Sequence, residues 1–244
     1  MRAQRFLIVN ADDFGSSPGV NQGIIRAHEQ GIVTSASLMV RMAAASDAAA
    51  YAREHPSFSI GLHFDLGEWT YRDEQWECVY EVVSLHDRTA VACQADKQLA
   101  AFQQLLNRNP SHIDSHQHIH RNEPVRSILI ELAQQLGVPL RHSSSAVHYC
   151  GEFYGQTSQG SPLPDAISVL GLMKILTGLP SGITELACHP GQGSDFRSVY
   201  ASERGHEVTT LCDPRIRATL TDQRIHLCSF ISDSFQRMFG GSDM

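Results

Sequence analysis

Short apolar runs alternate along the chain with longer stretches in which apolar residues recur every three or four positions. The short runs are rich in branched residues and end in polar ones, which is typical of buried strands, whereas the longer stretches are typical of amphipathic helices. Strands are predicted at FLIVNADD (ending at Asp13), TSASLMV (34–40), SIGLHFDL (59–66), HIDSHQHIH (112–120), PLRHS (139–143), ITELACHPG (183–191) and RIHLCSF (224–230).

Helices are predicted between these strands. Ser16, Ser17 and Pro18 supply an N-cap and a first-turn proline for a helix that ends near Gly31. The other predicted helices are an alanine-rich one through about residue 53, one with Leu99, Phe102, Leu105 and Leu106 on a single face, and three more over 124–136, 164–177 and 206–220.

This alternation predicts an α/β protein with a parallel sheet and helical crossovers. The chain has 244 residues, and a single β/α barrel has roughly 250. We therefore expect one domain over residues 1–244, folded as a distorted TIM-like barrel, complete or incomplete, rather than as an open doubly wound sheet.

Two segments interrupt the alternation. Residues 67–92 contain both tryptophans and two of the six tyrosines among many polar residues. This composition predicts a hairpin and a loop that faces the substrate. Residues 145–163 carry glycines and serines between aromatic residues, which predicts a second long loop.

Composition and charge narrow the class of partner. The formal net charge is -7, and no block of five or six like charges occurs, so a nucleic-acid partner is not expected. The apolar run Phe6–Val9 is too short for a signal peptide, and no stretch approaches the 18 apolar residues of a membrane span. The six scattered cysteines form no C-x-x-C pair. We expect a cytoplasmic protein with a small-molecule substrate, and a homodimer remains open.

Titratable residues follow four of the predicted strands. They are the Asp12–Asp13 pair, His63 with Asp65, the 112–120 cluster, and His189. In parallel α/β folds the carboxyl ends of the strands meet at one face, where ligands bind. We therefore expect these side chains to converge on one site.

The segment 112–120 is the strongest local signal. Thirteen histidines in 244 residues predict about 0.5 in nine positions, whereas four occur there. A spacing of two places Asp114 and all four histidines on one face of a strand. Alternate residues are about 6.6 Å apart along a strand, so one metal cannot bind them all. One histidine is expected to bind metal, while its neighbours line the site or support it.

A carboxylate, His63 and one histidine of this cluster would form a hydrolytic metal centre with positions left open to water. His189 precedes a Pro-Gly turn at another strand end, and Glu185 shares its face. An uncoordinated histidine at such a position suits a general acid, because its ordinary pKa lies near neutrality.

A nucleophile elbow and two nucleotide-binding motifs are excluded. Residues 15–19 match G-x-S-x-G, but the residue after the serine is Pro18, which has no N–H for an oxyanion hole. No G-x-x-x-x-G-K motif occurs, nor a G-x-G-x-x-G after a strand, so nucleotide binding has no support.

Four motifs resemble those of the YdjC, or ChbG/HpnK, family of carbohydrate deacetylases: NADDFG (10–15), GLHFDL (61–66), HIDSHQHIH (112–120) and ELACHPG (185–191). The resemblance implies a distorted β/α barrel and one divalent metal held by Asp13, His63 and His116. By analogy with polysaccharide deacetylases, Asp12 would be the general base and His189 the acid. Arg141 would orient Asp12. The remaining site residues expected to contact substrate or support the ligands are Asp114, His118, His120 and Glu185.

The expected activity is metal-dependent removal of an N-acetyl group from an amino sugar or short oligosaccharide. The metal would be Zn²⁺ or Mg²⁺, with Co²⁺ and Ni²⁺ as alternatives. An iron(II) oxygenase is a second hypothesis, because two histidines and one carboxylate also form that enzyme's facial triad. A non-catalytic metal-binding or sugar-binding module is a third.

Overall fold

The computed structural model describes residues 4–72, 74–193 and 200–239. Its main sheet is parallel in every pairing between its strands, in the order β6-β3-β2-β1-β8-β7, with β9 also paired with β1. These strands are β1 (Arg5–Phe14), β2 (Ser35–Leu38), β3 (Ser59–Phe64), β6 (Ile113–Ser115), β7 (Val147–Cys150), β8 (Gly182–Cys188) and β9 (Ile225–Leu227).

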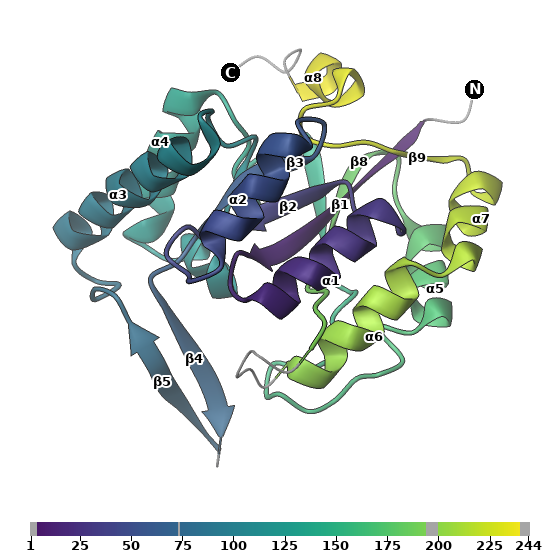
Figure 1. The fold of residues 1–244 in the computed structure, drawn as a ribbon, viewed down its shortest axis with the longest axis horizontal. Coiled ribbons are helices and arrows are strands. Elements are labelled where there is room, and N and C mark those ends of the chain that lie inside the picture. Colours follow the sequence, from purple (N-terminus) through teal and green to yellow (C-terminus); the bar gives the residue numbers. More distant parts are fainter. Residues whose placement is uncertain (1–3, 73, 194–199, 240–244) are drawn as a thin grey trace.

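Helices surround this curled sheet, as Figure 1 shows. Within the described residues the edge strands β6 and β7 do not pair with each other. The predicted distorted β/α barrel is therefore confirmed, in its incomplete form. The helices are α1 (Pro18–Glu29), α2 (Ala45–Glu54), α3 (Arg88–Leu106), α4 (Val125–Leu136), α5 (Val169–Gly178), α6 (Ala201–Leu211), α7 (Pro214–Asp222) and α8 (Asp233–Phe239), with a 3₁₀ helix, η1 (His116–Arg121).

The strand β1 is the centre of the sheet. It pairs with β8 over Arg5–Ala11 and with β2 from Asn10 onward. Leu7, Ile8 and Val9 are completely buried, because both faces of a parallel sheet are covered in such folds. Among the described helices, none combines the length and apolar character that a bilayer span requires.

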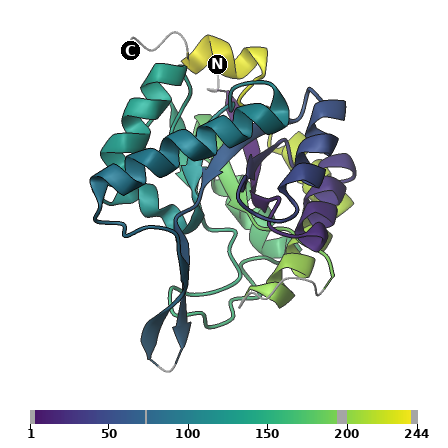
Figure 2. The ribbon, with the colours of Figure 1, turned by 60° about the vertical axis from the view of Figure 1, so that its left-hand side comes forward.

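Several local predictions are confirmed. The Ser17 hydroxyl accepts a hydrogen bond from the Val20 N–H, and Pro18 opens α1. Residues 67–92 contain the expected hairpin, formed by the antiparallel strands β4 (Gly67–Arg72) and β5 (Gln75–Glu81). Figures 1 and 2 show that this hairpin extends away from the body of the molecule.

Other boundaries were predicted wrongly. The helix expected over 206–220 is two helices, because Asp213 caps α7 and Pro214 occupies its first turn. The loop expected over 145–163 includes the strand β7. The strand expected over 139–143 is reduced to a single bridge between Ile113 and Leu140.

The prediction of one long strand over 112–120 is also wrong. The strand β6 ends at Ser115, opposite Phe64, which is the last residue of β3. The chain then enters η1, where Gln117 and His118 have left-handed backbones with φ of +50° and +55°. A strand continues only while it has a partner to pair with, so the histidines beyond His116 do not share its face.

Candidate active site

Two adjacent carboxylates, Asp12 and Asp13, lie near the carboxyl end of β1. Neighbours on a regular strand point to opposite faces. Here the pairing with β2 shifts register between Ala11 and Phe14, and Asp13 has a left-handed backbone with φ of +68°. Aspartate is among the few non-glycine residues that adopt this conformation readily. Both side chains can therefore reach one site, and both residues are at most 3% exposed.

Asp13, His63 and His116 come from three elements, β1, β3 and η1, and place their donor atoms together. Asp13 Oδ1 lies 3.3 Å from His63 Nε2 and 3.2 Å from His116 Nδ1. Ligands that bind a divalent ion at about 2.0–2.2 Å are about 3.0–3.4 Å apart. The three side chains can thus hold a metal ion.

Arg204, on α6, contacts the other carboxylate oxygen of Asp13. Its Nη2 donates to Asp13 Oδ2 over 2.6 Å, which leaves Oδ1 facing the two histidines. Burial opposes ionisation of Asp13, but Arg204 and the hydrogen bonds from His116 and His63 outweigh it and hold the carboxyl pKa well below its usual range. Asp13 is therefore a carboxylate at neutral pH, as a metal ligand must be.

The orientation of His63 is set by Asp114. The ring nitrogen Nδ1 of His63 lies 2.7 Å from Asp114 Oδ1, and this contact turns Nε2 towards Asp13. Asp114 itself is completely buried, and its Oδ2 accepts from the Ser37 hydroxyl over 2.7 Å. A carboxylate behind a histidine is the usual support of a metal-binding imidazole.

Arg141 connects the buried carboxylates of the site. Its guanidinium donates to both oxygens of Asp12, over 2.7 and 2.8 Å, and also contacts Asp114 at 2.8 Å and Glu185 at 2.7 Å. This bidentate contact fixes the plane of the Asp12 carboxylate. Burial raises the Asp12 pKa, but Arg141 more than offsets it, so the net shift is downward.

Glu185 responds differently to the same guanidinium. Burial dominates and raises its pKa to about 7, although Arg141 lowers it in part. Glu185 lies on β8, 2% exposed, and reaches the site only through Arg141. Within the described contacts, its part is to support Arg141.

His189 directly follows β8 and lies beside Asp12, with its Nε2 3.8 Å from Asp12 Oδ2. Its ring contacts the rings of Tyr154 and Tyr200 edge-on, and its backbone N–H donates to Glu207. Burial lowers the His189 pKa to about 4, so the imidazole is neutral at pH 7 in the chain alone.

The turn after His189 packs directly on α1. A Cβ atom added to Gly23 would lie 2.3 Å from the Cα of Gly191, a distance that real Cβ atoms do not reach. The Gln192 N–H also donates to the Gly19 carbonyl over 2.8 Å. The position of His189 therefore depends on the close approach of two backbones.

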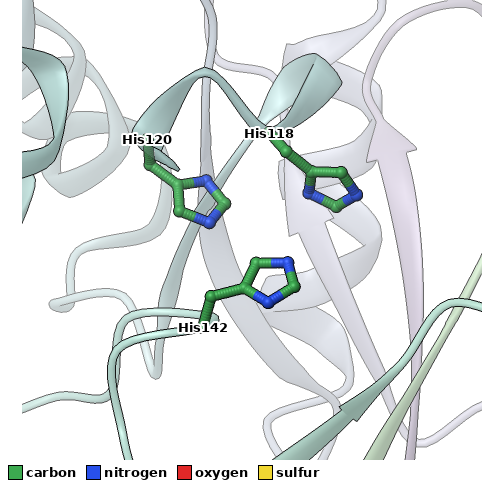
Figure 3. Close-up of side chains that lie close together, drawn as sticks. All are labelled: His118, His120 and His142. Carbon is green, nitrogen blue, oxygen red and sulfur yellow. The ribbon is translucent and has the colours of Figure 1, made fainter. Parts of the chain in front are cut away.

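Asp65 does not join this centre, although it follows β3 as predicted. It contacts Arg41 and accepts from the Tyr80 hydroxyl over 2.9 Å, and so anchors the β4–β5 hairpin. His118 and His120 are also separate from the Asp13 centre. They face His142, and Figure 3 shows these three rings around one small space.

Three residues with close contacts in the site escaped the sequence analysis: Arg204, Glu207 and His142. Arg204 and Glu207 lie in one helix without any recognisable motif. His142 had a signal, because it directly follows Arg141 at the end of a predicted strand. A count of histidines at all the predicted strand ends, and not only within residues 112–120, would have identified His142.

A known protein family matches most of this chain. The model of the YdjC-like protein family matches residues 6–222, which include every residue of the site. The chain belongs to the YdjC-like family. The resemblance carried by the four sequence motifs is thereby confirmed.

Relatives of this YdjC-like chain match over nearly their whole length. A carbohydrate deacetylase of Geobacillus stearothermophilus is 30% identical, covering 93% of this chain and 97% of the relative. A chitooligosaccharide deacetylase of Serratia marcescens is 31% identical, with coverages of 93% and 98%. The fold matches a crystal structure from Enterococcus faecalis V583, provisionally described as a cellobiose-phosphate cleavage protein, with a TM-score of 0.73, 24% identity and coverages of 93% and 98%.

Proposed function

We propose that this YdjC-like protein is a metal-dependent hydrolase that removes the N-acetyl group of an amino sugar or short oligosaccharide and releases acetate. One observation carries the proposal: the Asp13–His63–His116 triangle lies beside a second carboxylate, Asp12, which Arg141 holds separately. The Nε2 atom of His189 lies 3.8 Å from Asp12 Oδ2. The activities named for the Geobacillus and Serratia relatives support the same reaction.

The metal ligands in this proposal are Asp13, His63 and His116. A bound divalent cation would polarise the acetamide carbonyl and acidify a water molecule. Two imidazoles with one carboxylate suit Zn²⁺, Co²⁺ or Ni²⁺, and Mg²⁺ is admitted by the carboxylate. The chain's own contribution is to keep Asp13 ionised through Arg204 and His63 oriented through Asp114.

Asp12 is the proposed general base. Arg141 holds both of its oxygens and lowers its pKa, so the carboxylate is ionised and correctly oriented before substrate arrives. Because Arg204 and not Arg141 contacts Asp13, the two adjacent aspartates have separate partners and can have separate tasks. Asp12 accepts the proton of the attacking water, which becomes the new oxygen of acetate.

His189 is the proposed general acid that protonates the departing amine nitrogen. Since burial keeps the free imidazole neutral, its proton has to arrive during the catalytic cycle. Asp12 is the nearby group that has just gained a proton, and its Oδ2 lies 3.8 Å from Nε2 of His189. Transfer from Asp12 to His189 and then to the amine balances the protons of the hydrolysis.

Alternative activities are separable by their products. An iron(II) oxygenase would consume oxygen, and a binding module would turn nothing over. Cleavage of a cellobiose phosphate, the activity provisionally ascribed to the Enterococcus relative, would break a glycosidic bond. A deacetylase releases acetate and leaves every glycosidic bond intact.

The deciding experiment measures acetate release from N-acetylated mono- and oligosaccharides, with and without a chelator. We expect acetate from the untreated protein, none after chelation, and recovery when a divalent ion is restored. The His63→Ala, His116→Ala double variant should lose both the ion and the activity, while His148→Ala, an exposed histidine on β7, should keep both. Acetate release that survives chelation, or a double variant that retains the ion, would contradict the proposal.

A further inference from the structure

A second histidine cluster lies beside the site described above. His118 and His120 belong to η1, and His142 lies in the turn after Arg141. One ring nitrogen from each lies within 4.8 Å of the others. Figure 3 shows that the three rings come from opposite sides of the space between them.

We propose that His118, His120 and His142 form a second metal site, which binds Zn²⁺ or a similar transition-metal ion through three imidazoles. This site shares no ligand with the Asp13–His63–His116 centre. It is independent of the proposed function, because three imidazoles and one open position define a zinc site by themselves.

Two of the three rings each have a buried nitrogen without a hydrogen-bond partner among the described residues. Nδ1 of His118 and Nε2 of His120 are buried and make no hydrogen bond within the described part of the chain. His120 is 1% exposed, so its Nε2 is out of contact with bulk solvent. A buried polar atom without a partner is costly, and a bound cation would remove that cost.

The opposite nitrogens of the same two rings are anchored. His120 Nδ1 lies 2.6 Å from the Ser115 hydroxyl, and His118 Nε2 lies 3.2 Å from the Tyr149 hydroxyl. A metal-binding histidine normally donates its second N–H to an oxygen in this way, which fixes the tautomer and leaves the other lone pair free. Both rings thus have the support that a ligand requires.

The present spacing requires a small closure. Ligands bonded to zinc at about 2.0–2.1 Å are about 3.3 Å apart, so a cluster spread over as much as 4.8 Å must contract. His142 can supply this movement, because its side chain is exposed and lies in a turn. His118 and His120 can keep their hydroxyl partners while His142 closes on the ion.

The backbone supports the same arrangement. His118 and His142 both have left-handed conformations, with φ of +55° and +65°. Such conformations cost energy for residues other than glycine, asparagine and aspartate. Two of the three proposed ligands therefore hold an unfavourable backbone that directs their side chains into the cluster.

Charged groups of both signs lie near the cluster. The guanidinium of Arg141 is one positive group close by, with its Cζ 5.2 Å from the centre of the Tyr149 ring. It is outnumbered by the three carboxylates that contact it, those of Asp12, Asp114 and Glu185. Because its ligands are all nitrogen, the site should select zinc, copper or nickel over magnesium.

The test counts Zn²⁺ ions bound per full-length chain by equilibrium dialysis. We expect two for the wild type, one for His142→Asn, one for the His63→Ala, His116→Ala variant, and none for the three changes combined. Asparagine is chosen because it accepts the left-handed backbone of His142. The control, His148→Asn, alters an exposed histidine nearby and should still bind two. With Mg²⁺ in place of Zn²⁺, His142→Asn should match the wild type.

Thermal unfolding without metal checks that each variant is folded. If His142→Asn does not fold, His120→Ala removes another proposed ligand of the same site and takes its place in the test. In one outcome the wild type binds a single Zn²⁺, which His142→Asn loses and the His63→Ala, His116→Ala variant keeps. That result would support the second site and contradict the metal centre of the proposed function. A wild type that binds one ion, lost only in the double variant, would overturn the second site. So would two ions retained by both His142→Asn and His120→Ala.

Discussion

The two histidine clusters differ in what stands behind their rings. In the Asp13 centre, His63 is backed by the carboxylate of Asp114, and the ligand Asp13 is itself backed by Arg204. In the second cluster, His118 and His120 are backed by neutral hydroxyls. A carboxylate partner raises the basicity of an imidazole more than a hydroxyl does, so we expect His63 to be a stronger proposed ligand than His118 or His120.

The nine-residue segment 112–120 supplies histidines to both clusters. His116 faces Asp13, whereas His118 and His120 face His142, because the chain turns through left-handed backbones at Gln117 and His118. Gln117 also holds the β4–β5 hairpin, accepting from the Trp69 N–H and donating to the Trp69 carbonyl. A turn of two residues thus distributes the histidines and docks the hairpin.

The largest expected effect separates Asp12 from its metal-binding neighbour. Asp12→Asn should lower turnover by about 10²–10⁴-fold, because the amide cannot accept the water's proton. Bound metal should stay at the wild-type amount, since Asp13 keeps its own partner, Arg204. Metal analysis and acetate release on the same sample check both statements. Near-normal turnover with metal present would move the base to another group, with Asp114 the next candidate.

The next effect concerns the acid. His189→Ala should reduce hydrolysis of a plain N-acetyl sugar by about 10²-fold, within the range for a positioned acid. The same variant should slow hydrolysis of a trifluoroacetamide or an activated ester much less, because hydrolysis of these activated substrates depends less on protonation by a general acid. The ratio of the two rates is the measurement. Equal losses accompanied by loss of metal would instead make His189 a ligand.

A matched pair of variants sharpens the comparison of the two supports. Asp114→Asn should weaken metal binding at the Asp13 centre by about 10–100-fold, because His63 loses its carboxylate. Tyr149→Phe removes only a neutral hydroxyl from His118 and should weaken the second site by less. Zinc competition with a chromophoric chelator measures both. Equal effects would show that the charge behind the ring is irrelevant.

The smallest effect is on stability and concerns His112, which is 1% exposed and stacks on Phe230. Burial lowers its pKa to about 4, so between pH 6.5 and 4 the unfolded chain takes up a proton that the folded chain does not. Stability therefore falls as pH falls through this window. From pH 6.5 to 5.5 the His112 contribution is about 1 kcal/mol. Urea unfolding should show a fall smaller by that amount in His112→Gln, and an unchanged slope would refute the assignment.

Much of the site could be predicted because it lies at strand ends. Asp12, Asp13, His63 and His189 each follow an apolar run, and parallel strands bring such positions together. The turn at Gln117 could not be predicted, because it depends on where β3 ends and so on pairing between distant segments. Arg204 escaped for a related reason: a single arginine on a helix shows its partner only in the folded chain, where α6 packs on α1 and the arginine side chain reaches Asp13.

The contact between Gly23 and Gly191 has a consequence for redesign of this protein. Two residues with no side-chain chemistry set how deeply the turn carrying His189 sits against α1. A search for important positions by reactivity would pass over both, yet even an alanine at position 23 would push that turn outwards. Libraries that aim to alter substrate choice should therefore leave position 23 fixed, or vary it deliberately to shift His189, the proposed proton donor.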